Sequence, residues 1–219
     1  MLNSDLTTTN AASMMSDFLD YVLQDVDSYW IGVWTAAGYP EPWVNYAFPA
    51  PGEQVKVSTG CTPDESGLTN DSTAEYCASD DTIVISQTLA TGIWDGTVRA
   101  NMSANDRYST GDFSVAYVVA HEYAHSLQSE LNLLDAFETY KTELHADCWA
   151  GIWANSAYYK GILEAGDIEE AFQTTLDIGD YEFNNPGHHG TPQQRSSAFM
   201  AGYNSGVPAS CDTFLTSDY

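Results

Sequence analysis

The strongest constraint on this chain is residues 113–130, a run without proline or glycine that carries the pattern His-Glu-x-x-His. A run of this length and composition predicts a helix. His121 and His125 then lie about one turn apart on one face, so both imidazoles can reach a single metal ion. Glu122 is turned roughly 100° around the helix and can reach a water molecule on that metal without binding the metal itself. Two histidines packed in a core are the alternative, but this spacing is typical of zinc hydrolases.

A third candidate ligand, Glu143, lies in the next predicted helix. It would complete a three-ligand site that leaves one coordination position open for water. Asp147, one turn further on, can accept a hydrogen bond from the outer N–H of a ligand histidine. Most neighbours of these two carboxylates are apolar, where unpaired charges would be costly. We therefore predict one Zn²⁺ ion held by His121, His125 and Glu143, whereas His145 should pack or face solvent.

From Glu143 to Ala154 the sequence reads Glu-Leu-His-Ala-Asp-Cys-Trp-Ala-Gly-Ile-Trp-Ala. Together with His-Glu-x-x-His, this segment resembles the bacterial neutral zinc metallopeptidase family, which pairs the two motifs. Shorter matches occur at Tyr76-Cys77, 81–85, 189–191 and Gln194-Arg195, so the resemblance covers most of the chain from about Asp25. The chain departs from the family at Thr62, where glycine is usual, and at 196–199, where an aromatic pair is usual.

The resemblance implies a zinc-dependent peptidase, most simply an endopeptidase, that acts on peptide or protein substrates. The fold that we expect is α+β and zincin-like, mainly helical with a small sheet next to the His-Glu-x-x-His helix. Two other functions share the same zinc-binding residues. One is a zinc amidase of cell-wall peptides, and the other is a non-catalytic binding module stabilised by zinc. The intact Glu122 argues against the second.

Composition sets the broad class of the protein. The 219 residues, of which 43% are hydrophobic, suffice for a single domain over residues 1–219, with residues 1–10 as a flexible tail. The chain has 31 acidic and 6 basic side chains, and the resulting net charge of -25 excludes nucleic acid as a partner. The same charge would attract cationic substrates at low ionic strength. No apolar run is long enough for a membrane span, and nothing in the sequence predicts an oligomeric state.

The four cysteines, Cys61, Cys77, Cys148 and Cys211, allow three disulfide connectivities, with four buried thiols as the alternative. Scarce lysine and abundant Ser, Thr and Asn are typical of an exported protein. We therefore expect a secreted or extracytoplasmic chain whose targeting segment has been removed. The family resemblance favours pairing Cys61 with Cys77, which leaves Cys148 for Cys211.

Apolar periodicity and turn residues predict the other helices. They are expected at 11–34, through Glu143 to about Tyr159, at 168–178 and from Pro192 onward. Asp167 and Glu170 form the pattern of a capping box at the start of the 168–178 helix, and Gly179 should end it. Thr191 and Gln194 predict a second capping box, with Gly202 or Gly206 as the stop of that helix.

Strands are predicted at 43–48, 54–57 and 81–86. The β-branched segment 81–86 should be the strand nearest the zinc helix, and as an edge strand it could hold a peptide. Residues 88–112 contain several glycines and are expected to form a long irregular connection.

Peptide hydrolysis at such a site has defined requirements. Glu122 would act as general base, taking a proton from the attacking water and passing it to the leaving amine. A further donor should stabilise the oxyanion, and we predict His189 for this role. His188, Tyr181 and Arg195 are alternatives from the same part of the chain, although an arginine packed on a carboxylate would explain Arg195 equally well.

Overall fold

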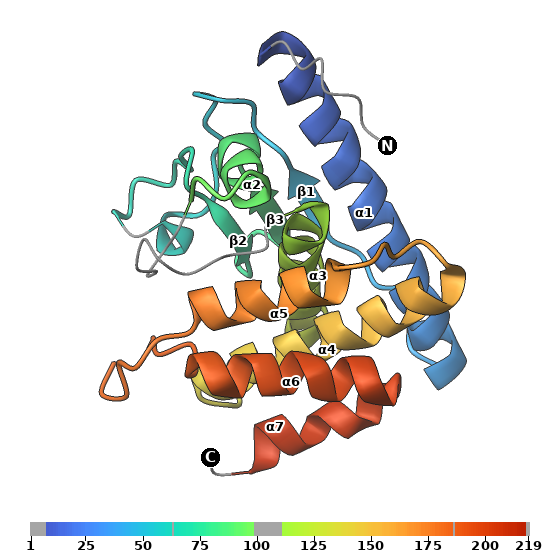
Figure 1. Ribbon diagram of the computed structural model, residues 1–219. Coiled ribbons are helices and arrows are strands. Elements are labelled where there is room, and N and C mark those ends of the chain that lie inside the picture. Colours follow the sequence, from blue (N-terminus) through green and yellow to red (C-terminus); the bar gives the residue numbers. More distant parts are fainter. Residues whose placement is uncertain (1–7, 63, 99–110, 186, 218–219) are drawn as a thin grey trace.

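The computed structural model describes residues 8–62, 64–98, 111–185 and 187–217. These residues form an α+β fold in which helices predominate and one small sheet lies beside them (Figure 1). The helices are α1 Thr8–Ala37, α2 Gln87–Trp94, α3 Asp112–Glu130, α4 Thr139–Lys160, α5 Asp167–Ile178, α6 Pro192–Ser205 and α7 Asp212–Thr216. Short 3-10 turns η1 and η2 occupy Thr59–Cys61 and Pro208–Cys211.

Helix α3 lies at the centre of the molecule, and it confirms the helix predicted at 113–130 (Figure 1). It packs against α1, α2, α4, α5 and the sheet. A helix with neighbours on so many sides buries most of its residues, and α3 does so from Phe113 to Gln128 with few exceptions. The sheet and α2 cover one side of α3, whereas α4, α5 and α6 lie on another (Figure 1).

Helix α1 confirms the amphipathic helix predicted at 11–34, and its apolar stripe is part of the core. Trp30 and Trp34 of this helix contact Trp149 of α4, with ring centroids 5.2 and 5.7 Å apart respectively. Of the predicted tail at 1–10, Thr8, Thr9 and Asn10 belong to α1, and residues 1–7 lie outside the described ranges. None of the described helices combines the length and apolarity needed to cross a membrane.

The sheet has the order β1-β3-β2, from strands Asn45–Ala47, Thr82–Ile85 and Ala74–Cys77 respectively. Strand β3 pairs in parallel with β1 and antiparallel with β2, so Glu75 lies opposite Val84. The strands predicted at 43–48 and 81–86 are confirmed, but β3 is central and the edge position beside α3 belongs to β2. No strand forms at 54–57, where the described structure has only a single bridge between Lys56 and Leu68.

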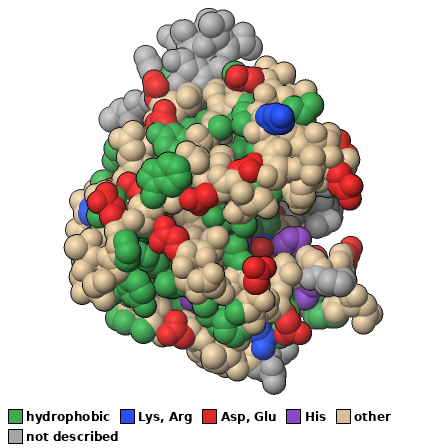
Figure 2. Space-filling model, turned by 180° about the vertical axis from the view of Figure 1, so that it is seen from behind, with side chains coloured by type: hydrophobic (Ala, Val, Ile, Leu, Met, Phe, Trp, Pro, Cys, Tyr) green, Lys and Arg blue, Asp and Glu red, His purple; other side chains and the backbone are tan. Residues whose placement is uncertain are grey.

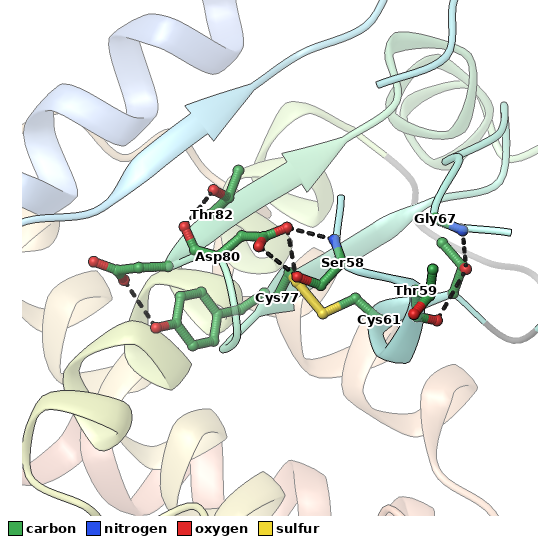
Figure 3. The surroundings of a disulfide bond; sticks show 10 residues. Ser58, Thr59, Cys61, Gly67, Cys77, Asp80 and Thr82 are labelled. Carbon is green, nitrogen blue, oxygen red and sulfur yellow. Dashed lines mark hydrogen bonds between the residues drawn. A yellow bond between two sulfur atoms is a disulfide. The ribbon is translucent and has the colours of Figure 1, made fainter. Parts of the chain in front are cut away.

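Both cysteine pairs expected from the resemblance are present, Cys61–Cys77 and Cys148–Cys211. Figure 3 shows the first pair at the end of β2, beside Asp80. The Asp80 carboxylate accepts hydrogen bonds from the backbone N–H and the hydroxyl of Ser58, and Cys77 Sγ lies 3.7 Å from it. The disulfide and Asp80 therefore fasten the 58–61 segment to the end of the edge strand.

Two local predictions need correction. The connection after β3 is not irregular throughout, because Ser86 caps α2 by accepting from the backbone N–H groups of Thr88 and Leu89. The predicted capping box of α5 is absent: Gly166 holds the N-cap position with a φ of 114°, and Glu170 instead accepts from the backbone N–H of Phe113. The predicted stop at Gly179 is confirmed.

Helix α6 begins with the predicted capping box of Thr191 and Gln194 and ends at Gly206, which adopts the left-handed conformation. Gly202 is therefore not a stop. It lies inside α6 where that helix crosses α4, and a Cβ atom there would lie 1.9 Å from the carbonyl oxygen of Cys148. Gly151 makes the matching approach from α4, where a Cβ atom would lie 2.1 Å from the carbonyl oxygen of Phe199. The two glycines let α4 and α6 pack closely.

Candidate metal centre

The structure brings His121, His125 and Glu143 together where α3 meets α4. Their ligand-type atoms all lie within 4.8 Å of one another. The two Nε2 atoms are 3.1 Å apart, and the Glu143 carboxylate oxygens lie 3.2 Å from His121 Nε2 and 3.4 Å from His125 Nε2. The helical spacing of the two histidines and the crossing of the two helices therefore produce one compact donor set.

This donor set fits zinc. Nitrogen and carboxylate ligands bind Zn²⁺ at about 2.0–2.2 Å, so the ligand atoms of a tetrahedral site are separated by roughly 3.3–3.6 Å. The two Nε2 atoms are 3.1 Å apart, and they lie 3.2 and 3.4 Å from Oε2 and Oε1 of Glu143 respectively, two different oxygens of that carboxylate. Each of these separations is close to the tetrahedral range. Three protein ligands would leave a fourth position for water or substrate.

Asp147 supports His121 from behind. The two groups are in contact, with His121 Nδ1 3.0 Å from a carboxylate oxygen of Asp147. Asp147 is completely buried and also accepts hydrogen bonds from the Tyr117 hydroxyl and from Nε and Nη2 of Arg195. This is the position that the sequence predicts for a carboxylate that orients a ligand histidine.

Arg195 compensates the buried negative charge. Its guanidinium lies 2.8 Å from Asp147 and 3.3 Å from Glu143, and the residue is 2% exposed. Burial alone would raise the pKa of Asp147, but Arg195 and then His121 outweigh it and hold that pKa below its usual value. Burial would likewise lower the pKa of His121, yet Asp147 and Glu143 raise it to about 10. A cation bound at the donor set would take the place of that proton.

Gln128 orients the second histidine, a role that the sequence analysis did not identify. Its side-chain oxygen lies 2.8 Å from Nδ1 of His125, which fixes the ring with Nε2 toward Glu143. Its amide nitrogen donates to the Thr142 carbonyl and lies 2.9 Å from Nδ1 of His145. His145 is fully buried against Trp149, so of the two expected positions, packed or facing solvent, it adopts the packed one. Burial lowers the pKa of His145 to about 3.

The donor set opens into a cavity of about 620 Å³, the size of a small-molecule or peptide site. Figure 2 shows histidine side chains in a hollow of the surface with acidic side chains beside them. Two sides of this cavity come from different elements. The helical wall consists of Tyr117, His121, Glu122, His125, Glu143 and Arg195, and the strand wall consists of Ala74, Glu75 and Tyr76 of β2. Glu122 thus lies on the same cavity as the donor set and is 9% exposed.

The residues considered as oxyanion donors differ in whether they line the cavity and in which groups they already contact. His189 lines the cavity, its side chain is 53% exposed, and its Nδ1 lies 3.4 Å from Asp180. His188 is buried and bonded to Asp180, and Tyr181 donates to Gln193, 3.0 Å away; neither contributes to the described wall of this cavity. Arg195 is bonded to Asp147 and Glu143, so it fits the alternative to an oxyanion donor, an arginine packed on a carboxylate.

Comparison with known proteins agrees with the motifs. Residues 3–214 match the family described as putative neutral zinc metallopeptidase. The chain is 36% identical to the uncharacterized protein YpfJ of Escherichia coli K12, over 55% of this chain and 52% of YpfJ. It is also 36% identical to the uncharacterized protein Rv2575 of Mycobacterium tuberculosis H37Rv, over 50% of this chain and 47% of Rv2575. The chain thus spans about half the length of these relatives. No solved structure matches it significantly, so the zincin-like fold stays a prediction.

Proposed function

Because the chain belongs to the neutral zinc metallopeptidase family, we propose that it is a zinc-dependent peptidase with its active site at the cavity between the helical wall and the strand wall. His121, His125 and Glu143 would hold the ion. The observation that carries this proposal is the compact donor set, within 4.8 Å, on a cavity that Glu122 also lines. An ion-pair cluster that serves folding alone would not need an adjacent glutamate on an open cavity.

The chemistry follows from the groups present. A bound zinc ion would polarise the scissile carbonyl and lower the pKa of the attacking water. Glu122 would accept a proton from that water and deliver it to the leaving amine, because it borders the donor set without belonging to it. Asp147 and Gln128 would hold the two histidine rings in their orientations. His189, exposed on the same cavity, would donate a hydrogen bond to the oxyanion.

A peptide substrate would bind along β2. This strand is at the edge of the sheet order β1-β3-β2 and contributes Ala74, Glu75 and Tyr76 to the cavity. An edge strand can hydrogen-bond an extended peptide through its backbone, which would align the scissile bond with the helical wall. A zincin-like fold would have this geometry. An endopeptidase would bind the middle of a peptide in this way, because binding along the strand does not require a free terminus of the substrate.

The two disulfides are typical of an oxidising compartment. We propose that the protein acts outside the cytoplasm, on peptides or proteins in that compartment. Mass mapping of the protein purified from its native source under non-reducing conditions would test this location. Free thiols at Cys61, Cys77, Cys148 and Cys211 would contradict it.

The proposed chemistry is tested by Glu122→Gln, which keeps the volume of the side chain but removes the base. This variant should retain zinc and lose about 10²- to 10⁴-fold in peptide hydrolysis. Glu41→Gln, an exposed acid away from the cavity, is the matched control and should retain both. Undiminished hydrolysis by the Glu122 variant would remove Glu122 as the base.

The metal assignment is tested by Glu143→Ala, which leaves only two protein ligands and should lose most of the zinc. Full zinc retention in this variant would show that the third ligand is wrong. Hydrolysis assays with both ordinary peptides and cell-wall peptides separate a peptidase from a cell-wall amidase, since the amidase should hydrolyse only the cell-wall peptides. Stoichiometric zinc without hydrolysis of any substrate would indicate a non-catalytic module.

A further inference from the structure

Glu75 is a half-buried acidic residue that the proposed chemistry does not use. It lies in the middle of β2, opposite Val84, and contributes to the wall of the same cavity as Glu122. Its Oε1 atom is buried and has no hydrogen-bond partner among the residues that the structure describes. A carboxylate oxygen removed from water without a partner is unfavourable, so such a group in a ligand cavity calls for an explanation.

The charges around Glu75 increase this cost. Burial first, and then the negative charge of Glu122, raise the pKa of Glu75. By contrast, Glu143 on the helical wall has His121, His125 and Arg195 beside it, and its pKa is held well below the usual value although burial opposes this. Arg195 is bonded to Asp147 and Glu143. The described part of the cavity wall therefore supplies cationic partners to Glu143 but none to Glu75.

We infer that Glu75 binds a cationic group of the substrate, an ammonium or guanidinium, and thereby selects positively charged peptides for hydrolysis. This inference rests on the proposed peptidase function. A cation placed between β2 and Glu122 would satisfy the unpartnered oxygen with a charge-assisted hydrogen bond. The net charge of -25 would draw such peptides to the protein, but only a group in the cavity can select the position of the charge in the substrate.

Two sources can supply this cation, a lysine or arginine side chain within the peptide or the free amino group at its end. Matched peptides distinguish these two sources. They carry lysine or glutamine at one position, each with a free or an acetylated N-terminus. The zinc-loaded protein should hydrolyse the cationic member of at least one pair about tenfold or more faster, as kcat/KM, since a hydrogen bond between charged groups is at stake. The pair that responds identifies the source.

Glu75→Gln should bring this ratio close to one, whereas Glu75→Asp, which keeps the charge, should retain part of it. Glu41→Gln removes one negative charge, as Glu75→Gln does, but at an exposed position, and it should leave the ratio of the parent protein unchanged. Far-UV circular dichroism verifies that each variant is folded. No preference in the parent, or a preference that Glu75→Gln leaves intact, would overturn the inference.

A binding measurement separates this inference from the proposed function. Fluorescence anisotropy with labelled lysine and glutamine peptides is measured on Glu122→Gln and on Glu122→Gln combined with Glu75→Gln. Loss of the lysine preference only in the double variant supports Glu75 as the cation site even if the parent protein hydrolyses no peptide. Equal lysine preference in both proteins excludes Glu75 as the cation site, whatever the activity of the parent.

Discussion

The helical wall and the strand wall of the cavity differ in how their polar groups are satisfied. Behind the helical wall, Asp147 has Tyr117, His121 and Arg195 as partners, and Gln128 bonds His125. On the strand wall, Glu75 keeps a buried oxygen without a partner among the described residues. A fully paired network holds its members in one geometry, whereas an unsatisfied group favours whatever ligand can complete it. The helical wall is thus suited to hold a metal, and the strand wall to recognise a substrate.

The largest effect should come from removing the central cation of the helical wall. Arg195→Met leaves Asp147 and Glu143 buried without their guanidinium, so we expect a loss of about 3–5 kcal/mol in the free energy of unfolding. Urea unfolding with chelator present measures it. Lys160→Met is the control, because Lys160 pairs with Asp25 through a side chain that is 39% exposed. That variant should lose less than about 1 kcal/mol.

The same substitution should change the response to acid. Burial would raise the pKa of Asp147, but Arg195 lowers it below the usual value. An ionised Asp147 therefore stabilises the fold at neutral pH, and this contribution is lost as the pH falls through the lowered pKa. Without Arg195 that pKa rises, so acid unfolding of Arg195→Met should begin at a higher pH than in the parent. Coincident acid unfolding curves would show that Arg195 does not set the charge state of Asp147.

The two disulfides provide a test on each wall. In the chain-entropy model, removing Cys148–Cys211, with a separation of 63, should cost about 4 kcal/mol. Removing Cys61–Cys77, with a separation of 16, should cost about 3 kcal/mol. Double cysteine-to-alanine variants are compared by urea unfolding, zinc content and KM. Loss of the first pair should reduce zinc retention more, because Cys148 follows Asp147 on α4, and loss of the second should raise KM more, because Cys77 ends β2. The reverse assignment would contradict the division between the walls.

Close packing of α4 on α6 keeps the helical wall together. Gly202→Ala would place a Cβ atom 1.9 Å from the Cys148 carbonyl oxygen, so we expect a destabilisation of about 3 kcal/mol. Gly32→Ala in α1 is the control, since no described atom lies within 4 Å of its added Cβ. That change should stabilise the helix by about 0.5–1 kcal/mol. Thermal unfolding of the two variants should move in opposite directions, and a shift in the same direction would show that the crossing can relax.

The smallest effect on zinc binding should come from Asp147→Asn. The amide keeps an acceptor oxygen for His121 but removes the charge, so zinc should be lost to a chelator about 10- to 100-fold more readily. Competitive titration with a chelator measures this. Gln128→Glu offers a comparison at the other histidine, because it adds a charge where the parent has an amide. A titration of Asp147→Asn identical to that of the parent would assign Asp147 a packing role.

Local sequence signals predict the parts of the site that lie within one helix. His121 and His125 share one face of a helix, and so do Glu143 and Asp147, because the members of each pair are four residues apart. Gln128 was missed although it lies only three residues after His125 in the same helix, because a glutamine at that spacing equally fits a surface position. Its contacts with Thr142 and His145 depend on how α4 packs against α3. Strand β2 was missed because Ala-Glu-Tyr-Cys contains no β-branched residue, and pairing with β3 decides its conformation.

Capping motifs show the same division between local and tertiary control. Thr191 and Gln194 cap their own helix, as predicted, because their partners are a few residues away. Asp167 and Glu170 have the same spacing, but Glu170 bonds Phe113 at the start of α3 and Asp167 accepts from Glu164. A pattern that can serve two helices is decided by the packing of those helices, which the pattern itself does not contain.

The residues of the helical wall are far apart along the chain, so they are synthesised at different times. His121 and Arg195 are separated by 74 residues, so α3 and α4 leave the ribosome well before α6. Until α6 arrives, Asp147 and Glu143 have no guanidinium beside them, and the close crossing at Gly151 and Gly202 cannot form. A nascent chain that already contains the complete zinc-binding motif therefore lacks the surroundings that hold it in place. The donor set acquires its full surroundings only after most of the chain has been made.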